Sequence, residues 1–454
     1  MQDTPILRAS EVIISELLAG IPTARVKRGQ KYPKDHETKE RYFYLDLVTS
    51  FDIETSKEHY DTGPDCWRSW MYIWQWQFGD IATVIGRTWE EFTGIINQIN
   101  EWLPDNTRML CFIHNASFEF QFIAGIWHFE PEDIFATDVR DVLYFRMGRI
   151  EMRCSYRLSN YSLDEWSKEN HVDHRKLVGN LDYNVVRYPW TELTDKELAY
   201  CVNDVICVVE CVTAMLRSYG DNLYSLPYTA TGYIRRRVRE SMRMWSKSAI
   251  QSMMGDLTCY DRLLKTFRGG NTHANRWWVD RLLGDVYSAD RSSSYPDVIC
   301  HCKYPMTAFR NELPTWERFQ KCLDMGRAII CLIRFHNIRL KNNEIGCPYI
   351  PYDLCAKRKN RPPKGVKEDN GRILSAVSLE IALTDIDFEI IQDMYDWDGE
   401  PEFEWIMSAR YGYLPRPLID VVISLYKDKT SLKGIPGREV VYSHSKAELN
   451  ACYG

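Results

Sequence analysis

The chain lacks the cysteine pattern of a zinc module or a disulfide-stabilised protein. Its 454 residues include 14 cysteines, but none form Cys-x-x-Cys pairs. Cys300 and Cys302 are too close together for a zinc knuckle, and Cys207 and Cys211 lie four apart in an apolar run. We therefore expect buried, reduced thiols, with no zinc and no disulfide framework.

Long apolar runs are also missing. No stretch approaches the roughly 18 apolar residues that a membrane span requires. The first residues lack a basic region followed by an apolar one, so we expect no signal peptide and no membrane partner. The chain is 45% hydrophobic and 26% charged, which is typical of a globular protein, and its length favours several domains.

The net charge of −6 does not indicate nucleic-acid binding, but positive charge is concentrated locally. Between residues 228 and 291, twelve Lys and Arg outnumber six Asp and Glu. A second basic stretch, 357–367, contains two prolines and predicts an exposed loop. Solvated surface is the common explanation of such runs, and contact with phosphates is the alternative.

The first candidate site lies on a predicted strand. Residues 41–55 are rich in aromatic and β-branched types, which favour a strand. On a strand, Asp52 and Glu54 share one face while Ile53 points to the other. Two such carboxylates repel each other unless a cation lies between them, and Mg²⁺ or Mn²⁺ prefers oxygen ligands.

Two further acidic positions follow. The apolar run 109–113 leads to Glu119 at the start of a predicted helix. A longer helix predicted over 195–217 places Tyr200 and Asp204 four residues apart, on one face. Taken alone, each of these patterns most often belongs to an ordinary protein surface. Together, four carboxylates can hold two cations about 4 Å apart, which predicts 3′→5′ phosphodiester hydrolysis on an RNase H-like α/β fold.

These three motifs resemble the exonuclease motifs of family B DNA polymerases, most closely the protein-primed group of phages, linear plasmids and organelles. They read Phe-Asp-Ile-Glu-Thr at 51–55, His-Asn-Ala-Ser-Phe-Glu at 114–119 and Tyr-Cys-Val-Asn-Asp at 200–204. The resemblance implies that the acidic residues bind catalytic metals: Asp52, Glu54, Glu119 and Asp204. It implies that Tyr200 orients the attacking water.

The same resemblance implies contacts to a single-stranded primer end. The implied residues are Thr55, Asn115, Phe118, Leu163, Lys176 and Tyr183. Two departures from the family pattern stand out. Glu119 replaces Asp and is one methylene longer, and the spacing of Lys176 before the Leu-Asp-Tyr stretch at 181–183 does not settle its match.

The second half resembles the polymerase part of the same family. Phe267-Arg268-Gly269-Gly270 is similar to a Tyr-x-Gly-Gly element, which implies that Phe267, Gly269 and Gly270 contact DNA. Residues 284–290 predict a strand that ends at Asp290, before Ser-Ser-Ser-Tyr-Pro. This resembles motif A, and implies that Asp290 binds catalytic metals and that Tyr295 packs under the deoxynucleotide sugar.

Residues 446–454, Lys-Ala-Glu-Leu-Asn-Ala-Cys-Tyr-Gly, resemble motif B. Helical spacing places Lys446, Asn450 and Tyr453 on one face, and the resemblance implies that they bind the incoming nucleotide. Lys429, on a predicted helix upstream, is a further candidate, with an ordinary solvated helix as the alternative.

A second palm carboxylate, the Asp-x-Asp of motif C, does not follow motif B. The two Asp-x-Asp pairs, at 385–387 and 396–398, precede it, and we interpret both as structural. One carboxylate cannot position two metals, so we expect no synthesis by this chain alone. Three explanations stay open: an incomplete gene, a stop codon that the host reads through, or a second chain that supplies motif C and the thumb.

The expected fold is therefore multidomain, α/β and α+β. We expect an N-terminal extension (1–40), an RNase H-like 3′→5′ exonuclease domain (41–225), a linker and DNA-binding segment (226–284) and an incomplete palm (285–454). In the palm, an insertion at about 300–415 is expected to contact a terminal protein and DNA.

The expected function is protein-primed DNA synthesis with proofreading, in viral or plasmid replication. The expected cofactors are Mg²⁺ or Mn²⁺, with dNTP as substrate, and the expected partners are primer and template DNA and a terminal protein. The expected location is the cytoplasm, that of the host if the chain is viral, and an organelle stays open. The alternatives are a stand-alone DEDD-type 3′→5′ exonuclease and a non-catalytic DNA-binding remnant.

Overall fold

The protein divides into two compact units. Unit 1 comprises Met1–Arg236 and Lys429–Ala451, and unit 2 comprises Arg237–Asp428 and Cys452–Gly454. The computed structural model describes residues 4–61, 66–138, 140–177, 181–245, 247–274, 278–342, 347–356, 362–436 and 438–452. The basic stretch at 357–361 and Tyr453 therefore lie outside the described residues.

Unit 1 is built on a mixed sheet of eight strands, in the order β1-β4-β3-β2-β5-β8-β7-β6. The strands are β1 (Ile6–Arg8), β2 (Phe43–His59), β3 (Trp67–Phe78), β4 (Ala82–Gly86), β5 (Thr107–Ile113), β6 (Ile134–Asp138), β7 (Asp141–Met147) and β8 (Ile150–Cys154). β2 runs antiparallel to β3 and parallel to β5. The strand predicted over 41–55 and the apolar run 109–113 are confirmed as β2 and β5.

Seven described helices belong to unit 1. They are α1 (Ile14–Leu17), α2 (Trp89–Trp102), α3 (Ala116–Ile123), α4 (Ser155–Ser159), α5 (Leu163–Glu169), α6 (Asp195–Ser218) and α15 (Glu439–Asn450). α6 confirms the helix predicted over 195–217, and the side chains of Thr194 and Glu197 form a capping box at its start. α6 is long and apolar enough to cross a bilayer, but 78% of its apolar window is buried, as in a core helix.

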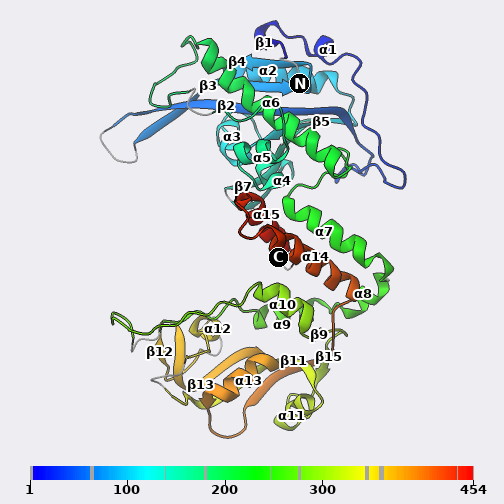
Figure 1. Cartoon of the computed structure of the whole chain (residues 1–454). Helices are drawn as coiled ribbons and strands as arrows, with labels where there is room; N and C mark the ends of the chain where they lie inside the picture. The colour runs from blue at the N-terminus through cyan, green and yellow to red at the C-terminus, as the bar shows by residue number, and fades with distance from the viewer. Residues whose placement is uncertain are drawn as a thin grey trace. The chain divides into compact units, whose positions relative to one another are not determined.

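The two faces of this sheet are covered by different helices. Phe51 and Ile53 of β2 lie in one core with Phe92 of α2. On the other face, Phe112 of β5 packs with Val208 of α6, which runs across the sheet (Figure 1). Because side chains alternate along a strand, Asp52 and Glu54 share one face, as the sequence predicts, and α6 covers that face.

The first forty residues do not form a separate appendage. β1 pairs in parallel with β4, at the edge of the sheet. Ile14 and Leu18 are fully buried in the core that α2 forms with β2 and β3. Unit 1 thus begins well before residue 41, where the sequence analysis places the start of the first domain.

Unit 2 contains a seven-stranded sheet, β10-β15-β11-β13-β12, with β14 paired to β11 and β9 to β15. The strands are β9 (Tyr304–Pro305), β10 (Arg310–Glu312), β11 (Arg327–Leu340), β12 (Lys367–Asp369), β13 (Arg372–Thr384), β14 (Tyr395–Asp396) and β15 (Glu402–Gly412). Its helices are α8 (Lys247–Met253), α9 (Leu257–Thr266), α10 (Ser294–His301), α11 (Trp316–Asp324), α12 (Tyr352–Ala356) and α13 (Asp385–Met394). α7 (Ala230–Ser241) and α14 (Arg416–Leu432) each cross the division between the units.

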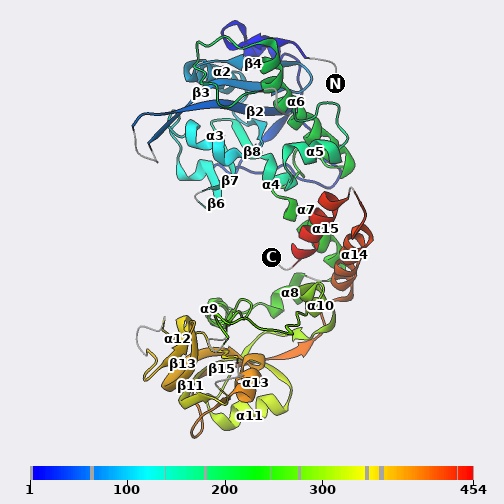
Figure 2. The same cartoon turned by 60° about the vertical axis from the view of Figure 1, so that its left-hand side comes forward.

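Alternate residues of β11 divide the core of unit 2. Cys331 lies in a cluster with Phe319 of α11 and Phe388 of α13. Leu332 faces the other way and packs with Cys259 of α9. Figure 2 shows α9 and α11 on opposite sides of this sheet. The sheet, which the sequence analysis treats as an insertion, therefore has a core of its own.

Both Asp-x-Asp pairs have structural contacts. Asp387 closes a capping box with Thr384 at the start of α13, and Asp385 accepts a hydrogen bond from the backbone N–H of Ile329. In the second pair, Asp398 accepts hydrogen bonds from Arg339 and Asn337. These contacts confirm the structural interpretation of Asp385, Asp387 and Asp398.

Candidate active site

Four carboxylates converge on the face of the unit 1 sheet that α6 covers. β2 supplies Asp52 and Glu54, the first turn of α3 supplies Glu119, and α6 supplies Asp204. The charge of Asp204 acts on both Asp52 and Glu54. Glu119 shares a hydrogen bond with Asp52. Residues far apart in the sequence are thus brought together as the three motifs predict.

Burial and mutual repulsion keep protons on this cluster. Burial, reinforced by the charge of Asp204, raises the pKa of Asp52 to about 7. Burial together with Asp52 and Asp204 raises the pKa of Glu54 to about 9. Burial also raises the pKa of Glu119 well above its ordinary value, with Asp52 adding to the effect. Neighbouring buried carboxylates cannot all ionise unless positive charge is supplied.

Lys176 supplies one positive charge. Its Nζ lies 3.6 Å from Oδ2 of Asp204. The side-chain amide of Asn203, on α6, donates a 2.6 Å hydrogen bond to the carbonyl of Arg175 and so anchors the segment that carries Lys176. Burial lowers the pKa of Lys176, but the charges of Asp204 and Asp52 outweigh it and keep this pKa above its usual value. The structure therefore places Lys176 beside the carboxylates, which its spacing in sequence does not settle.

Two tyrosines lie at the edge of the cluster. The hydroxyls of Tyr183 and Tyr200 are 2.9 Å apart and share a hydrogen bond. Tyr200 is buried on α6, whereas Tyr183 is exposed. Burial, the hydrogen bond to Tyr183 and the charge of Asp204 raise the pKa of Tyr200. Tyr200 therefore stays a neutral phenol that can donate a hydrogen bond.

The donor set fits a hard divalent cation. Buried oxygens Oε2 of Glu119 and Oδ1 of Asp204 have no hydrogen-bond partner in the described part of the chain. Anionic oxygens of this kind are the ligands that Mg²⁺ and Mn²⁺ prefer. However, no group of three His, Cys, Asp or Glu among the described residues is already arranged to hold a metal. The hydrogen bond between Asp52 and Glu119 and the ammonium of Lys176 offset part of the repulsion among these carboxylates.

Of the residues predicted to hold a primer end, Leu163 lies beside this cluster, and Asn115 and Phe118 lie at the start of the helix that carries Glu119. Thr55 follows Glu54 on β2 but, by strand alternation, shares the face of Ile53. Phe118 is 41% exposed on α3, and the exposed Asn115 precedes that helix in the left-handed conformation, with φ of 78°. Leu163, at the start of α5, lines a cavity of about 70 Å³ together with Asp52 and Lys176. Thr55 is half-buried on β2, next to Glu54.

Two further residues belong to the site but are not singled out by the sequence analysis. Gln75 lies opposite Asp52 in the β2–β3 pair and donates a 3.1 Å hydrogen bond to its Oδ2. His114 lines the same cavity, and burial together with Lys176 lowers its pKa to about 4. His114 stands within the second motif, whereas Gln75 could be found only from the register of β2 and β3.

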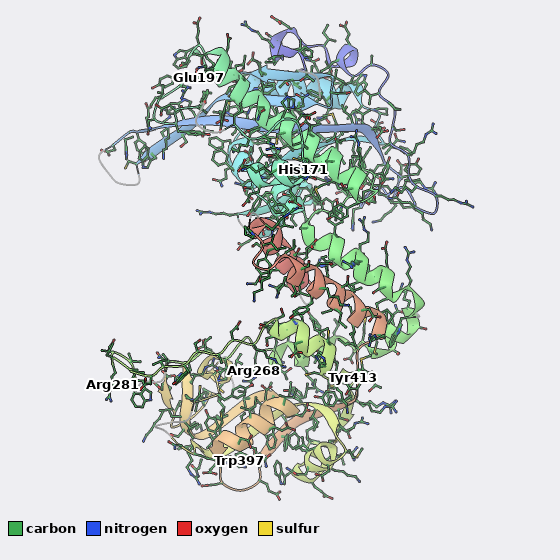
Figure 3. All side chains as sticks on the ribbon, viewed as in Figure 1. His171, Glu197, Arg268, Arg281, Trp397 and Tyr413 are labelled. Carbon is green, nitrogen blue, oxygen red and sulfur yellow. The ribbon has the colours of Figure 1, made fainter. Side chains whose placement is uncertain are left out.

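The glycine element of unit 2 follows α9 as irregular structure. Phe267 is largely exposed, and Gly269 and Gly270 have open space around them. Between them, Arg268 donates a 2.9 Å hydrogen bond to the carbonyl of Ala382, and its Nε lies 3.2 Å from Oδ1 of Asp387 (Figure 3). Arg268 thus fixes this segment to the sheet of unit 2.

Motif A does not have the predicted secondary structure. Residues 284–290 form no strand and are exposed, so the predicted strand ending at Asp290 is wrong. No described strand pairs with this segment, and its backbone polar groups therefore face solvent rather than a sheet. Tyr295 is in the first turn of α10 and is 58% exposed.

The described motif B residues lie on a helix, as predicted, and so does Lys429. Lys446 and Asn450 are on α15, in unit 1, and Lys429 is on α14. Asp290 and Tyr295 belong to unit 2.

Comparison with solved structures places this chain beside a known polymerase. Phi29 DNA polymerase complexed with primer-template DNA and incoming nucleotide substrates superposes with a TM-score of 0.65 at 16% sequence identity, over 90% of this chain and 68% of that one. The fold is similar to that of Phi29 DNA polymerase. The same polymerase with primer-template DNA, or with single-stranded DNA, gives TM-scores of 0.62 and 0.61.

The likeness to Phi29 DNA polymerase extends over most of both units. At this identity it concerns the fold, which is mixed α/β with two units and a large mixed sheet. No protein-family model matches the sequence, and no curated protein matches it either.

Proposed function

We propose that unit 1 is an RNase H-like 3′→5′ exonuclease domain of a protein-primed family B DNA polymerase. One observation carries the proposal: buried carboxylates from β2, α3 and α6 meet beside Lys176 and Tyr200. If Tyr200 and Asp204 were only a surface pair, or if Asp52 and Glu54 were only a chance Asp-x-Glu, these side chains would not come together in one place.

The chemistry follows from the residues present. When held by the four carboxylates, Mg²⁺ or Mn²⁺ supplies the charge that activates water and stabilises the departing 3′ oxygen. Release of the proton shared by Asp52 and Glu119 frees their oxygens for that role. The neutral Tyr200 hydroxyl orients the water, and the charge of Lys176 lowers the pKa of Asp204 against the larger rise that burial causes. Phe118, Asn115, Leu163 and Thr55 hold the terminal nucleotides.

For the remaining chain we propose the polymerase role that the resemblance implies. The resemblance implies a metal-binding role for Asp290 and nucleotide-binding roles for Tyr295, Lys429, Lys446, Asn450 and Tyr453, and it implies that Phe267, Gly269 and Gly270 contact DNA. The sheet of unit 2, within about 300–415, contacts a terminal protein and DNA. The likeness in fold to Phi29 DNA polymerase and the positive charge of 228–291 support this role.

Synthesis by these 454 residues alone is not expected. Asp290 is a single palm carboxylate, and Asp385, Asp387 and Asp398 have structural partners. A stand-alone exonuclease is therefore the second candidate, because the carboxylates for hydrolysis come together while those for synthesis do not.

The test is degradation of 3′-labelled single-stranded DNA with Mg²⁺ or Mn²⁺. The Asp52→Ala/Glu54→Ala variant is expected to lose at least about 100-fold in rate, since two of four metal ligands are removed. Asp46→Asn, an exposed change on the same strand, is the control and should keep the wild-type rate.

Two outcomes decide between the candidates. If the wild type and the double variant both leave DNA intact, the exonuclease proposal fails and a DNA-binding remnant remains. Extension of a primer with dNTPs by the isolated chain would overturn our expectation about synthesis.

A further inference from the structure

Three aromatic rings are stacked on the surface of unit 1, and none of them has been assigned a role so far. Tyr188 stacks on Trp70 at 5.1 Å and 5°, and on Trp190 at 4.9 Å and 1°. Trp190 is 78% exposed, so one face of its ring rests on Tyr188 and the other is open to solvent. We call these three residues the aromatic stack.

Specific hydrogen bonds hold the aromatic stack in place. The indole N–H of Trp70 donates to the carbonyl of Arg187 at 2.8 Å, and the Tyr188 hydroxyl donates to Glu58 at 3.1 Å. The guanidinium of Arg187 is buried and paired at 2.9 Å with Glu197. Glu197 lies at the start of α6 (Figure 3). The open ring of Trp190 is therefore presented on a rigid support rather than on a free loop.

The aromatic stack continues the face of β2 that carries the carboxylates. Side chains alternate along a strand, so four residues of β2 share this face: Asp52, Glu54, Ser56 and Glu58. Ser56 accepts a hydrogen bond from the backbone N–H of Arg187, and Glu58 accepts one from Tyr188. At about 3.3 Å per residue, Glu58 lies roughly 13 Å beyond Glu54.

The chemistry of this surface suits the bases of a nucleic acid. A flat ring with one open face binds another flat ring by stacking, and every base offers such a face. Arg68, opposite Glu58 on β3, is an exposed cation whose charge acts on Tyr188, and it can meet one phosphate. Because Glu58 lies beside Arg68, the local charge is balanced. We therefore expect base stacking, rather than charge, to dominate the binding of a nucleic acid here.

We propose that single-stranded DNA whose 3′ end occupies the carboxylate site stacks an upstream base on Trp190. This inference rests on the proposed exonuclease function for the position of the 3′ end. A span of roughly 13 Å corresponds to about four stacked nucleotides at ~3.4 Å each. Trp190 lies beyond Glu58, on the far side of Tyr188, so the stacked base is at least about four nucleotide steps from the 3′ end, and Trp190 acts only on strands long enough to reach it.

Binding is measured with labelled oligothymidylate in EDTA, which prevents hydrolysis. Trp190→Ala should weaken the affinity for an oligonucleotide of about twelve nucleotides by about tenfold, and leave that for one of about three nucleotides unchanged. Trp190→Tyr, which keeps a flat ring, should restore most of the affinity. Trp67→Ala is the control, because Trp67 lies on the same hairpin and packs on His59, on the opposite face.

The results separate this inference from the exonuclease proposal. If Trp190→Ala leaves the long-oligonucleotide affinity unchanged, or weakens both lengths equally, the inference is wrong even when the wild type degrades DNA. If the wild type degrades no DNA but loses long-oligonucleotide binding through Trp190→Ala, stacking stands and the exonuclease proposal falls. Trp190-dependent binding of a proline-rich peptide without binding of DNA would also overturn the inference.

Discussion

At the scale of single residues, the carboxylate cluster combines burial with excess negative charge. Asp52 and Glu54 hold protons in the absence of a cation, because burial and their neighbours raise both pKa values. A cluster of this kind destabilises the fold whenever it is forced to ionise without compensation. Its stability is therefore linked to pH and to divalent cations.

The pH dependence has a definite sign. Carboxyl pKa values are about 4 in an unfolded chain, against about 7 for Asp52 and about 9 for Glu54 in the fold. The folded state binds more protons between these limits, so the free energy of unfolding falls as the pH rises. In EDTA, the melting temperature of unit 1 should fall between about pH 5 and pH 9. Calorimetry of Asp52→Asn should show a shallower fall, and a melting temperature about 3–6 °C above wild type at high pH.

The control for this prediction is Asp46→Asn, which changes an exposed carboxylate of the same strand and should follow the wild-type curve. A melting temperature that rises with pH over this window would contradict it.

Lys176 offers a second test at this scale. Replacement by Met removes the ammonium 3.6 Å from Asp204 while keeping a long side chain. The carboxylates then repel each other more strongly, and we expect the rate of DNA degradation to fall about 10- to 100-fold. Steady-state kinetics with single-stranded DNA would separate kcat from KM. Lys168→Met, an exposed lysine paired with Asp164, should change neither.

At the scale of helices and strands, the sequence predicted the elements that have local signals. β2 and β5 follow runs of apolar and β-branched residues, and α6 follows an apolar helical run that Thr194 caps. The predicted strand at 284–290 failed because a strand needs a partner, which local sequence does not reveal. For the same reason Gln75 was missed, since only the pairing of β2 with β3 brings it to Asp52.

The start of α13 carries a prediction of its own. Asp387 caps the helix, accepts a hydrogen bond from Tyr349 and pairs with Arg268, whose side chain is 11% exposed. Asp387→Ala should lower the free energy of unfolding of unit 2 by about 3 kcal/mol, because a cap is lost and a largely covered cation loses its partner. Urea denaturation of the wild type and the variant measures this change in the free energy of unfolding.

Asp396→Ala serves as the control, because Asp396 is exposed and its loss should cost no more than about 0.5 kcal/mol. Primer extension by the wild-type chain that is lost in Asp387→Ala with unchanged stability would show instead that this Asp-x-Asp pair has a catalytic role.

At the scale of the whole molecule, the division into two units separates the candidate sites. The four clustered carboxylates belong to unit 1, and Asp290 belongs to unit 2. A lone exposed carboxylate binds Mg²⁺ or Mn²⁺ far more weakly than four that converge. A divalent cation should therefore stabilise one unit and leave the other almost unchanged.

Calorimetry of the full chain should show two transitions, because each unit has a core of its own. Mn²⁺ at about 100 times its dissociation constant should raise the unit 1 transition by about 5–10 °C. The unit 2 transition should move by less than about 1 °C. The Asp52→Ala/Glu54→Ala variant should abolish the shift, and equal shifts of both transitions would contradict the assignment.

The return of the chain to unit 1 has a consequence for biosynthesis. α15 completes unit 1, with Leu449 buried and the charge of Glu448 near Tyr161 and Tyr219, yet it follows all of the main segment of unit 2. At about 5–20 residues per second, a ribosome needs roughly 10–40 s to translate the intervening stretch of roughly 190 residues. During that interval the nascent unit 1 exposes the surface that α15 later covers. The unit that emerges first is thus the last to be finished, and it is the one that a chaperone would have most time to bind.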